Sequence, residues 1–270
     1  MYANKTILIT GANSGLGRNL ALNYAKQGGR IVNLSRNIKK MESLQKELEN
    51  INHKYHFYYP VDVSNFKQIE SIKKDMIIKK VMPDVVINNA AGNFLCSFRK
   101  LTPNGWNRVI DIVLNGTFNI TKIFGEEMIR HNKQGVFLTI STTYANTGSA
   151  LTIPSAVAKS GTETLMKSLS VEWSKYNIRF VGIAPGPMEN TGGLSKLDKL
   201  NLYKYRNYWI NPRKRMANLD EISELSLFLT NNDCADYING TVIRIDGGEY
   251  NQNSGQFNFI TNIPFWEKIF

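Results

Sequence analysis

Stretches of consecutive apolar and β-branched residues alternate along the chain with stretches whose apolar positions recur at the helical period. The first pattern predicts strands, expected at residues 5–10, 30–34, 55–61, 85–87, 136–140, 178–184 and 241–245. The second predicts helices, expected at residues 15–27, 38–51, 65–81, 103–130, 155–175 and 219–230. Such alternation is typical of a parallel sheet with helices on both faces. We therefore expect an α/β fold of Rossmann type, a doubly wound parallel sheet of about seven strands.

Two segments interrupt this alternation. Residues 187–218 are rich in proline, glycine and aromatic side chains and separate the sixth strand from the last helix, so we expect a substrate lid there. Residues 250–270 show no clear period and are expected to form a C-terminal tail. Because the sequence contains no repeat, low-complexity segment or linker, we expect a single domain over residues 1–270.

Composition narrows the class of protein. No uncharged apolar run reaches the roughly 18 residues that a membrane span needs, so no membrane association is expected. The two cysteines, Cys96 and Cys234, are too few for a disulfide framework and fit a reducing compartment. The three histidines are scattered, and no spacing predicts a metal site. The net charge of +11 favours anionic partners, but the basic residues are spread through the predicted helices and form no tail.

A glycine-rich stretch, Thr10-Gly11-Ala12-Asn13-Ser14-Gly15-Leu16-Gly17, connects the first predicted strand to the first predicted helix. Glycines there let the backbone turn tightly and approach a pyrophosphate, which the free N–H groups and the dipole of the helix stabilise. The alternative is an ordinary helix-entry turn with incidental glycines. Because a strand precedes the stretch and an amphipathic helix follows it, we expect Gly11, Ala12, Asn13, Ser14, Gly15 and Leu16 to bind a dinucleotide cofactor.

The ends of the second and third strands concern the adenosine part of that cofactor. An acidic residue near the end of the second strand would hold a free ribose 2′-hydroxyl, but the sequence there is Asn33-Leu34-Ser35-Arg36. Arg36 is available for a 2′-phosphate, so NADP(H) is expected over NAD(H). Asp62, at the end of the third strand, is expected to accept from the adenine amino group. The structural alternative for Arg36 is a surface arginine, and the alternative for Asp62 is a helix cap.

A third stretch, residues 141–159, follows the fifth predicted strand and enters a helix. Ser155 and Lys159 are four residues apart and therefore share one helix face. Tyr144 lies just beyond the strand end, where a loop can direct its side chain to the same place. A phenol, a hydroxyl and an ammonium group together suit the stabilisation of negative charge on a carbonyl-derived oxygen next to a nucleotide.

These motifs carry a resemblance that covers roughly residues 4–250. The glycine stretch, Asn88-Asn89-Ala90-Ala91-Gly92, Asn115 and Pro185-Gly186-Pro187 resemble the short-chain dehydrogenase/reductase family. The family's usual Tyr-x-x-x-Lys is Ser155-x-x-x-Lys159 here, and its usual serine is Thr142. These departures are similar to the 2,4-dienoyl-CoA reductase branch of mitochondrial type, in which a tyrosine matching Tyr144 replaces the missing one.

The resemblance implies NADPH-dependent reduction of an acyl-CoA thioester, 2,4-dienoyl-CoA, to 3-enoyl-CoA in the β-oxidation of unsaturated fatty acids. It implies that Tyr144 and Asn93 donate hydrogen bonds to the thioester oxygen, that Lys159 holds the nicotinamide ribose, and that Ser155 bonds near the nicotinamide or Lys159. Pro185, Gly186, Pro187 and Met188 are expected along the nicotinamide. Family positions for the CoA arm are Arg36, Phe94, Thr102 and Lys196, although Thr102 is equally suited to cap a helix before Pro103.

A homotetramer without nucleic-acid or membrane partners is also implied. A cytoplasmic location is expected if the numbering starts at the true N-terminus, and the mitochondrial matrix if a presequence was removed. Two other functions stay open at this point. One is a 2-enoyl or 3-oxoacyl thioester reductase of the same family; the other is a non-catalytic protein that binds NADP or nucleic acid, motivated by the isoelectric point of 9.5.

Overall fold

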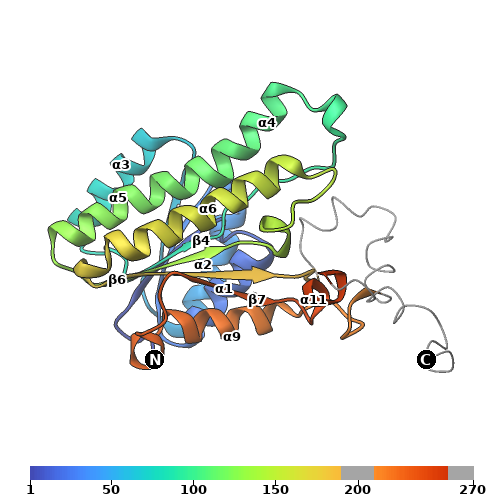
Figure 1. Ribbon diagram of the computed structural model, residues 1–270. Coiled ribbons are helices and arrows are strands. Elements are labelled where there is room, and N and C mark those ends of the chain that lie inside the picture. Colours follow the sequence, from blue (N-terminus) through green and yellow to red (C-terminus); the bar gives the residue numbers. More distant parts are fainter. Residues whose placement is uncertain (190–209, 255–270) are drawn as a thin grey trace.

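The fold is a seven-stranded parallel sheet with the strand order β3-β2-β1-β4-β5-β6-β7 (Figure 1). The computed structural model describes residues 1–189 and 210–254. The strands are β1 (Thr6–Thr10), β2 (Arg30–Ser35), β3 (Phe57–Pro60), β4 (Val85–Asn88), β5 (Gly135–Ile140), β6 (Ile178–Pro185) and β7 (Thr241–Ile245). The predicted α/β class is confirmed, and all seven predicted strands form. The third is shorter than the predicted 55–61, because only Phe57–Pro60 pair with β2.

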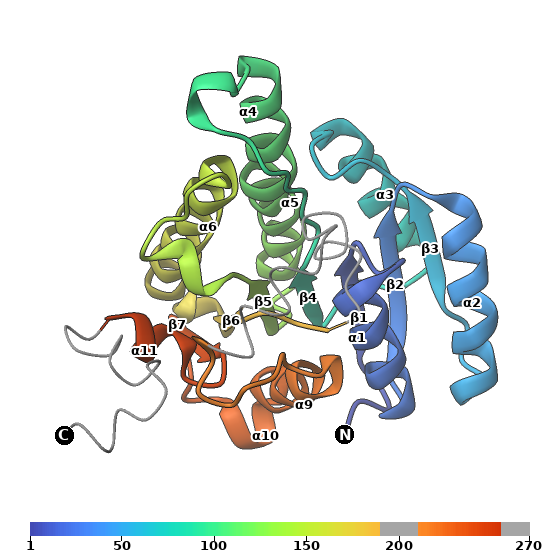
Figure 2. The same cartoon turned by 90° about the vertical axis from the view of Figure 1, so that its right-hand side faces the viewer.

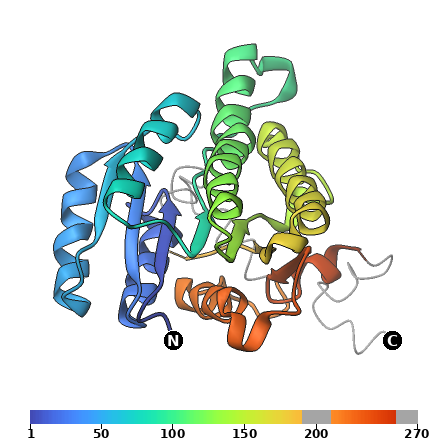
Figure 3. The same ribbon diagram turned by 90° about the vertical axis from the view of Figure 1, so that its left-hand side faces the viewer.

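Helices cover both faces of the sheet, as Figures 2 and 3 show end-on. One layer contains α1, α2 and α9 and packs on Ile7, Ile9 and Ile31; the other contains α3, α5 and α6 and packs on Leu8, Val32 and Phe137. The successive residues of β1 therefore serve opposite cores, as the period of two in a strand requires. The helix bounds are α1 (Gly15–Lys26), α2 (Ile38–Asn52), α3 (Phe66–Ile78), α4 (Pro103–Ile110), α5 (Gly116–Arg130), α6 (Ile153–Glu172), α9 (Leu219–Thr230), α10 (Asn232–Ala235) and α11 (Glu249–Ser254).

The long helix predicted at 103–130 contains a change of helix type. A π-helical turn, η2 (Asp111–Asn115), separates α4 from α5. Thr102 caps α4, because its hydroxyl accepts from the backbone N–H of Gly105 at 3.1 Å, and Pro103 occupies the first turn. Within the π turn, the side-chain amide of Asn115 donates to Asp111. Short 3-10 segments form at η1 (Phe98–Lys100), η3 (Thr143–Ala145) and η4 (Ser174–Tyr176).

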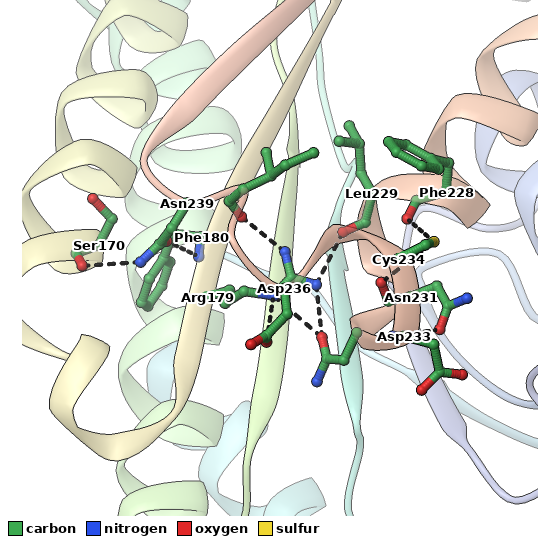
Figure 4. Close-up of polar contacts among 12 residues, drawn as sticks. Ser170, Arg179, Phe180, Phe228, Leu229, Asn231, Asp233, Cys234, Asp236 and Asn239 are labelled. Carbon is green, nitrogen blue, oxygen red and sulfur yellow. Dashed lines mark hydrogen bonds and ion pairs between the residues drawn. The ribbon is translucent and has the colours of Figure 1, made fainter.

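A buried arginine ties β6 to the chain that leads into β7. The guanidinium of Arg179 donates to Leu229 and Ile238 carbonyl oxygens at 3.1 and 2.9 Å and to Asn232 at 2.6 Å (Figure 4). Asp236 adds an ion pair at 3.7 Å. Because buried guanidinium groups are stable only when their N–H donors are satisfied, these contacts fix the turn around α10 against the sheet.

The predicted lid and tail fall largely outside the described residues. Of the lid at 187–218, Met188 bridges to Ala217 alongside the C-terminal end of β6, while residues 190–209 are not described. The tail predicted at 250–270 begins with α11, and residues 255–270 are not described. In the part of the chain that the structure describes, no helix is long and apolar enough to cross a membrane, and no group of three or more His, Cys, Asp or Glu side chains is placed to hold a metal ion.

Candidate active site

The strand order reverses direction between β1 and β4, which leaves a crevice at the carboxyl ends of these strands, where open α/β sheets bind ligands. The glycine stretch lies over this crevice. Gly11 and Gly15 have positive φ angles of 71° and 53°, which side-chain-bearing residues adopt only with strain. Gly17 packs so closely that a Cβ there would lie 2.4 Å from the carbonyl oxygen of Gly11. The stretch therefore turns as tightly as a pyrophosphate loop requires.

The first turn of α1 is suited to an anion. Ser14 precedes the helix without a side-chain cap hydrogen bond, and the first turn contains no acidic residue. The N–H groups of that turn are thus left without a side-chain cap, and the helix dipole adds positive potential. With the glycine geometry above, these residues fit a nicotinamide dinucleotide.

Thr10, which the sequence analysis did not single out, ties the glycine stretch to β4. Its hydroxyl accepts from the backbone N–H groups of Asn89 and Ala90 at 3.0 and 2.9 Å and donates to the carbonyl oxygen of Ile87 at 3.3 Å. The side-chain amide of Asn89 donates to the Thr10 carbonyl oxygen at 2.9 Å. These hydrogen bonds join the glycine stretch to the motif that follows β4, across the crevice. The occurrence of both motifs directly after predicted strands was the signal in the sequence for this contact.

At the end of β2, Arg36 and Asp62 face each other. Their closest atoms are 3.8 Å apart, and Arg36 is largely exposed. Burial acts to raise the pKa of Asp62, but hydrogen bonds from Ser64 and the charges of Arg36 and Arg108 outweigh it and lower that pKa. Asp62 closes a turn with Ser64, and Asn65 is the residue that caps α3. The cap considered for Asp62 is therefore wrong, and Arg36 is free to reach an anion beside it.

Tyr144 and Ser155 meet on the other side of the crevice. The 3-10 segment η3 follows β5 and directs Tyr144 toward α6, where its hydroxyl lies 3.1 Å from that of Ser155. Ser155 is buried in the first turns of α6. In this structure Ser155 pairs with Tyr144, and its expected contact near the nicotinamide or Lys159 stays a prediction. The phenol of Tyr144, which lies on a loop, thus reaches Ser155. The hydroxyl of Ser155 lies on α6 one turn before Lys159.

Lys159 is 7% exposed, and its ammonium donates to the backbone carbonyl oxygen of Ile140 at the end of β5. Burial lowers the pKa of Lys159 to about 8, and the neighbouring carboxylate of Glu163 opposes this shift. Lys159 is therefore a buried residue of α6 and not a surface lysine. The Lys159 ammonium thus lies on α6 one turn beyond Ser155, the residue that Tyr144 contacts.

The segment after β4 carries the other predicted contacts. The side-chain oxygen of Asn93 accepts from the backbone N–H of Phe94 at 2.9 Å, which leaves its NH₂ group to donate elsewhere. The backbone N–H of Cys96 donates to the carbonyl oxygen of Leu151 at 2.8 Å and joins this segment to the loop before α6. Asn93 and Tyr144 therefore come from two loops that are tied together.

The end of β6 closes the site. Pro185 is the last residue of β6, and a Cβ on Gly186 would lie 2.9 Å from Asp246, so the chain passes close to the end of β7. Pro187 and Met188 follow; the Pro187 carbonyl oxygen accepts from the backbone N–H of Ala217 at 2.9 Å. Lys196, predicted to contact the CoA arm, lies outside the described residues.

Comparison with known proteins agrees with this geometry. A family model described as short chain dehydrogenase matches residues 5–200, which is most of the chain. The chain belongs to the short-chain dehydrogenase family. This family accounts for the sheet, the glycine loop and the buried lysine on α6, and it makes the protein an oxidoreductase.

Relatives within this family share most of the chain. It is 40% identical over 251 residues to a Bacillus subtilis protein named probable 2,4-dienoyl-CoA reductase, (2E)-enoyl-CoA-producing, covering 91% of this chain and 96% of that protein. A Caenorhabditis elegans protein named probable 2,4-dienoyl-CoA reductase, (3E)-enoyl-CoA-producing, is 34% identical, with 94% and 83% covered. A crystal structure of a short chain dehydrogenase from Bacillus anthracis is 36% identical with a TM-score of 0.82, covering 91% of this chain and 96% of that one.

One further residue beside this site was not predicted from the sequence. Glu163 is buried on α6, four residues beyond Lys159, and accepts a hydrogen bond from the Ser141 hydroxyl. The signal was present, because the four-residue spacing that links Ser155 to Lys159 continues to this position.

Proposed function

We propose that this protein is an NADPH-dependent 2,4-dienoyl-CoA reductase that converts 2,4-dienoyl-CoA to 3-enoyl-CoA in the β-oxidation of unsaturated fatty acids. The observation that carries the proposal is the 3.1 Å contact between the hydroxyls of Tyr144 and Ser155. The helix position one turn before Lys159 holds a serine, and the phenol beside it comes from the loop. Proteins named 2,4-dienoyl-CoA reductase among its relatives support this substrate class.

The chemistry requires stabilisation of charge far from the carbon that is reduced. The bound cofactor supplies the hydride that adds to the δ-carbon of the dienoyl group. Electrons then move through the conjugated system onto the thioester oxygen, and a dienolate forms. Hydrogen-bond donors aimed at that oxygen lower the barrier, and the residues assigned to this task are Tyr144 and Asn93.

The remaining site residues position these groups. Lys159 holds the nicotinamide ribose and favours donation by the phenol, while Ser155 fixes the Tyr144 hydroxyl. The turn of residues 11–16 holds the pyrophosphate, Arg36 the 2′-phosphate and Asp62 the adenine amino group. Residues 185–188 line the nicotinamide. The assignment of the CoA arm to Arg36, Phe94, Thr102 and Lys196 is part of the same proposal; Ser64 stands where an arginine contact is common.

The position of the final proton defines the product. Protonation of the dienolate at the α-carbon gives a 3-enoyl thioester, whereas protonation at the γ-carbon gives a 2-enoyl thioester. The Bacillus subtilis relative carries the name of a (2E)-enoyl-CoA-producing enzyme, and this favours a second candidate in which the γ-carbon is protonated. We assign the 3-enoyl product, in line with the loop tyrosine, and take a homotetramer in the cytoplasm or mitochondrial matrix as its setting.

The test is a spectrophotometric assay with 2,4-hexadienoyl-CoA, comparing NADPH with NADH, followed by mass and NMR analysis of the product. We expect NADPH consumption in proportion to substrate, a higher kcat/KM with NADPH, and a double bond between carbons 3 and 4. A double bond between carbons 2 and 3 would support the second candidate. No NADPH consumption with this substrate, but turnover of a 2-enoyl or 3-oxoacyl thioester, would refute the assignment.

A further inference from the structure

Three polar side chains are buried in a row on one face of α6. Ser155, Lys159 and Glu163 follow one another at intervals of four residues and are 3%, 7% and 2% exposed. This spacing places them in a line along the helix axis. The first two belong to the site described above. The third, Glu163, has no role in the proposed reaction, although a buried carboxylate is costly unless it is compensated.

The end of β5 holds the second and third members of this row. Lys159 donates to the carbonyl oxygen of Ile140, and the hydroxyl of the next residue, Ser141, donates to the carboxylate of Glu163. The last residue of β5 and the residue after it thus fix the ammonium and the carboxylate in neighbouring positions. The ammonium of Lys167 lies 3.6 Å from the other carboxylate oxygen, with half of its side chain exposed.

Glu163 also borders a polar cavity of about 680 Å³ between α6 and β7, together with Lys167, Arg244 and Asp246. The lining of this cavity carries both positive and negative side chains. The Glu163 carboxylate therefore lies between the α6 turn that carries Lys159 and a cavity lined by side chains of both charges.

We propose that Glu163 is a positioning residue of the active site, whose carboxylate, anchored by Ser141, is the counter-charge that keeps Lys159 protonated and oriented. The inference rests on the function proposed above for Lys159. Burial lowers the pKa of this lysine and so favours its neutral form, and the Glu163 charge opposes that shift. A neutral Lys159 would neither bind ribose hydroxyls as strongly nor favour donation by Tyr144.

The elements η3, η2 and α4 pack against α6, and their ionisable groups make other contacts. Tyr144 on η3 contacts Ser155, Asp111 on η2 accepts from Asn115, and Arg108 on α4 acts on Asp62. On the β7 side, Arg244 and Asp246 share the cavity with Glu163. The charge that raises the pKa of Lys159 is that of Glu163.

The test compares Glu163→Gln with two matched variants. Glu163→Gln keeps the shape of the side chain and can still accept from Ser141, but removes the charge. Lys167→Gln removes the exposed partner of Glu163 and leaves the carboxylate in place. Glu163→Asp keeps the charge on a shorter side chain. If Glu163→Gln does not fold, as judged by circular dichroism, Glu163→Met fills the same volume without a buried amide.

The first readout is the ionisation of Lys159 itself, followed by NMR in protein labelled at lysine Cε and assigned with Lys159→Met. We expect the midpoint to fall by roughly one to two pH units in Glu163→Gln, the size of a neighbouring charge in a partly buried site. Lys167→Gln and Glu163→Asp should stay within about half a unit of the wild type. An unchanged Lys159 midpoint in Glu163→Gln would overturn the proposal, whatever the enzyme does with dienoyl-CoA.

The second readout is the pH profile of NADPH binding and of kcat/KM. The basic limb should move to lower pH in Glu163→Gln, with a loss of about 5- to 50-fold at pH 8 that shrinks toward pH 6. A loss of equal size at every pH would mark a structural role and contradict the proposal. If the wild-type protein binds NADPH but does not reduce dienoyl-CoA, the proposed function fails while the Lys159 titration still decides the role of Glu163.

Discussion

The hydroxyl of Tyr144 on η3 lies 3.1 Å from the hydroxyl of Ser155 on α6. Eleven residues separate the two, and the loop between them is held to the segment after β4 through the Cys96–Leu151 backbone hydrogen bond. The loop supplies the phenol of Tyr144. Ser155 on the helix holds the hydroxyl of that phenol and fixes its direction.

Ser155→Ala should therefore weaken catalysis without weakening cofactor binding. Loss of one neutral hydrogen bond that orients the phenol should lower kcat about 5-fold, since such a bond contributes about 1 kcal/mol. The Kd for NADPH, measured by fluorescence titration, should change less than about twofold. Ser160→Ala, on an exposed position of the same helix, is the control and should leave both quantities unchanged. An unchanged kcat in Ser155→Ala would show that the 3.1 Å contact does not orient Tyr144.

Arg36→Gln should reduce the preference for NADPH. Arg36 is exposed beside Asp62 at the end of β2, where a 2′-phosphate would replace part of its solvent. We expect the KM for NADPH to rise about 10- to 100-fold and the KM for NADH to change less than threefold, because charge-assisted contacts to phosphate contribute roughly 1.5–3 kcal/mol. Lys39→Gln, on the neighbouring exposed surface, should change neither. Equal changes for both cofactors would place the 2′-phosphate elsewhere.

The arrangement of the sheet and its two helix layers could be predicted from the sequence, because apolar runs and helical periods are local signals. The π turn at Asp111–Asn115 could not, since it does not alter the polarity pattern. The same limit applied to the site. The turn at residues 10–17 was visible as a motif, but the partner of Ser155 depends on where η3 directs Tyr144, and this is a tertiary property. The burial of Lys159 depends on the position of β5 beneath α6, which is also a tertiary property.

Arg179→Met should destabilise the protein. The guanidinium is buried and holds carbonyl oxygens of Leu229 and Ile238, which are more than 49 residues away in sequence (Figure 4). Removing it leaves these acceptors unsatisfied, so the free energy of unfolding should fall by about 2–4 kcal/mol in urea denaturation. Asp236→Asn, whose side chain is 78% exposed, is the matched control and should cost under about 0.5 kcal/mol. A loss below about 1 kcal/mol in Arg179→Met would contradict the structural role assigned to the Arg179 guanidinium, shown in Figure 4.

His56 should make the fold sensitive to mild acid. Its Nδ1 accepts from the backbone N–H of Ile31 at 3.0 Å, and Nε2 lies 2.9 Å from the side-chain oxygen of Asn52, so the neutral ring satisfies both. Burial lowers the pKa of His56 to about 4. Between that value and the ordinary 6.5, the unfolded chain binds a proton that the folded protein does not, so stability present above pH 6.5 is lost as the pH falls toward 4.

The measurement is urea denaturation of the wild type and of His56→Gln at pH 7 and pH 4.5. The wild type should lose about 1–2 kcal/mol more than His56→Gln over this interval, after allowance for solvent screening. His53→Asn removes an exposed histidine whose left-handed conformation suits asparagine, and it should keep the wild-type pH dependence. Parallel pH curves for the wild type and His56→Gln would refute this assignment.

The most direct test of the proposed mechanism is steady-state reduction of 2,4-hexadienoyl-CoA by Tyr144→Phe with saturating NADPH. The substitution removes one oxygen atom and keeps the ring on η3, so the NADPH Kd and the fold should match the wild type. A kcat at least about 100-fold lower is predicted, the typical effect of losing a donor to a developing oxyanion. A kcat within about threefold of the wild type would show that the Tyr144 hydroxyl does not stabilise the dienolate and would contradict the proposed mechanism.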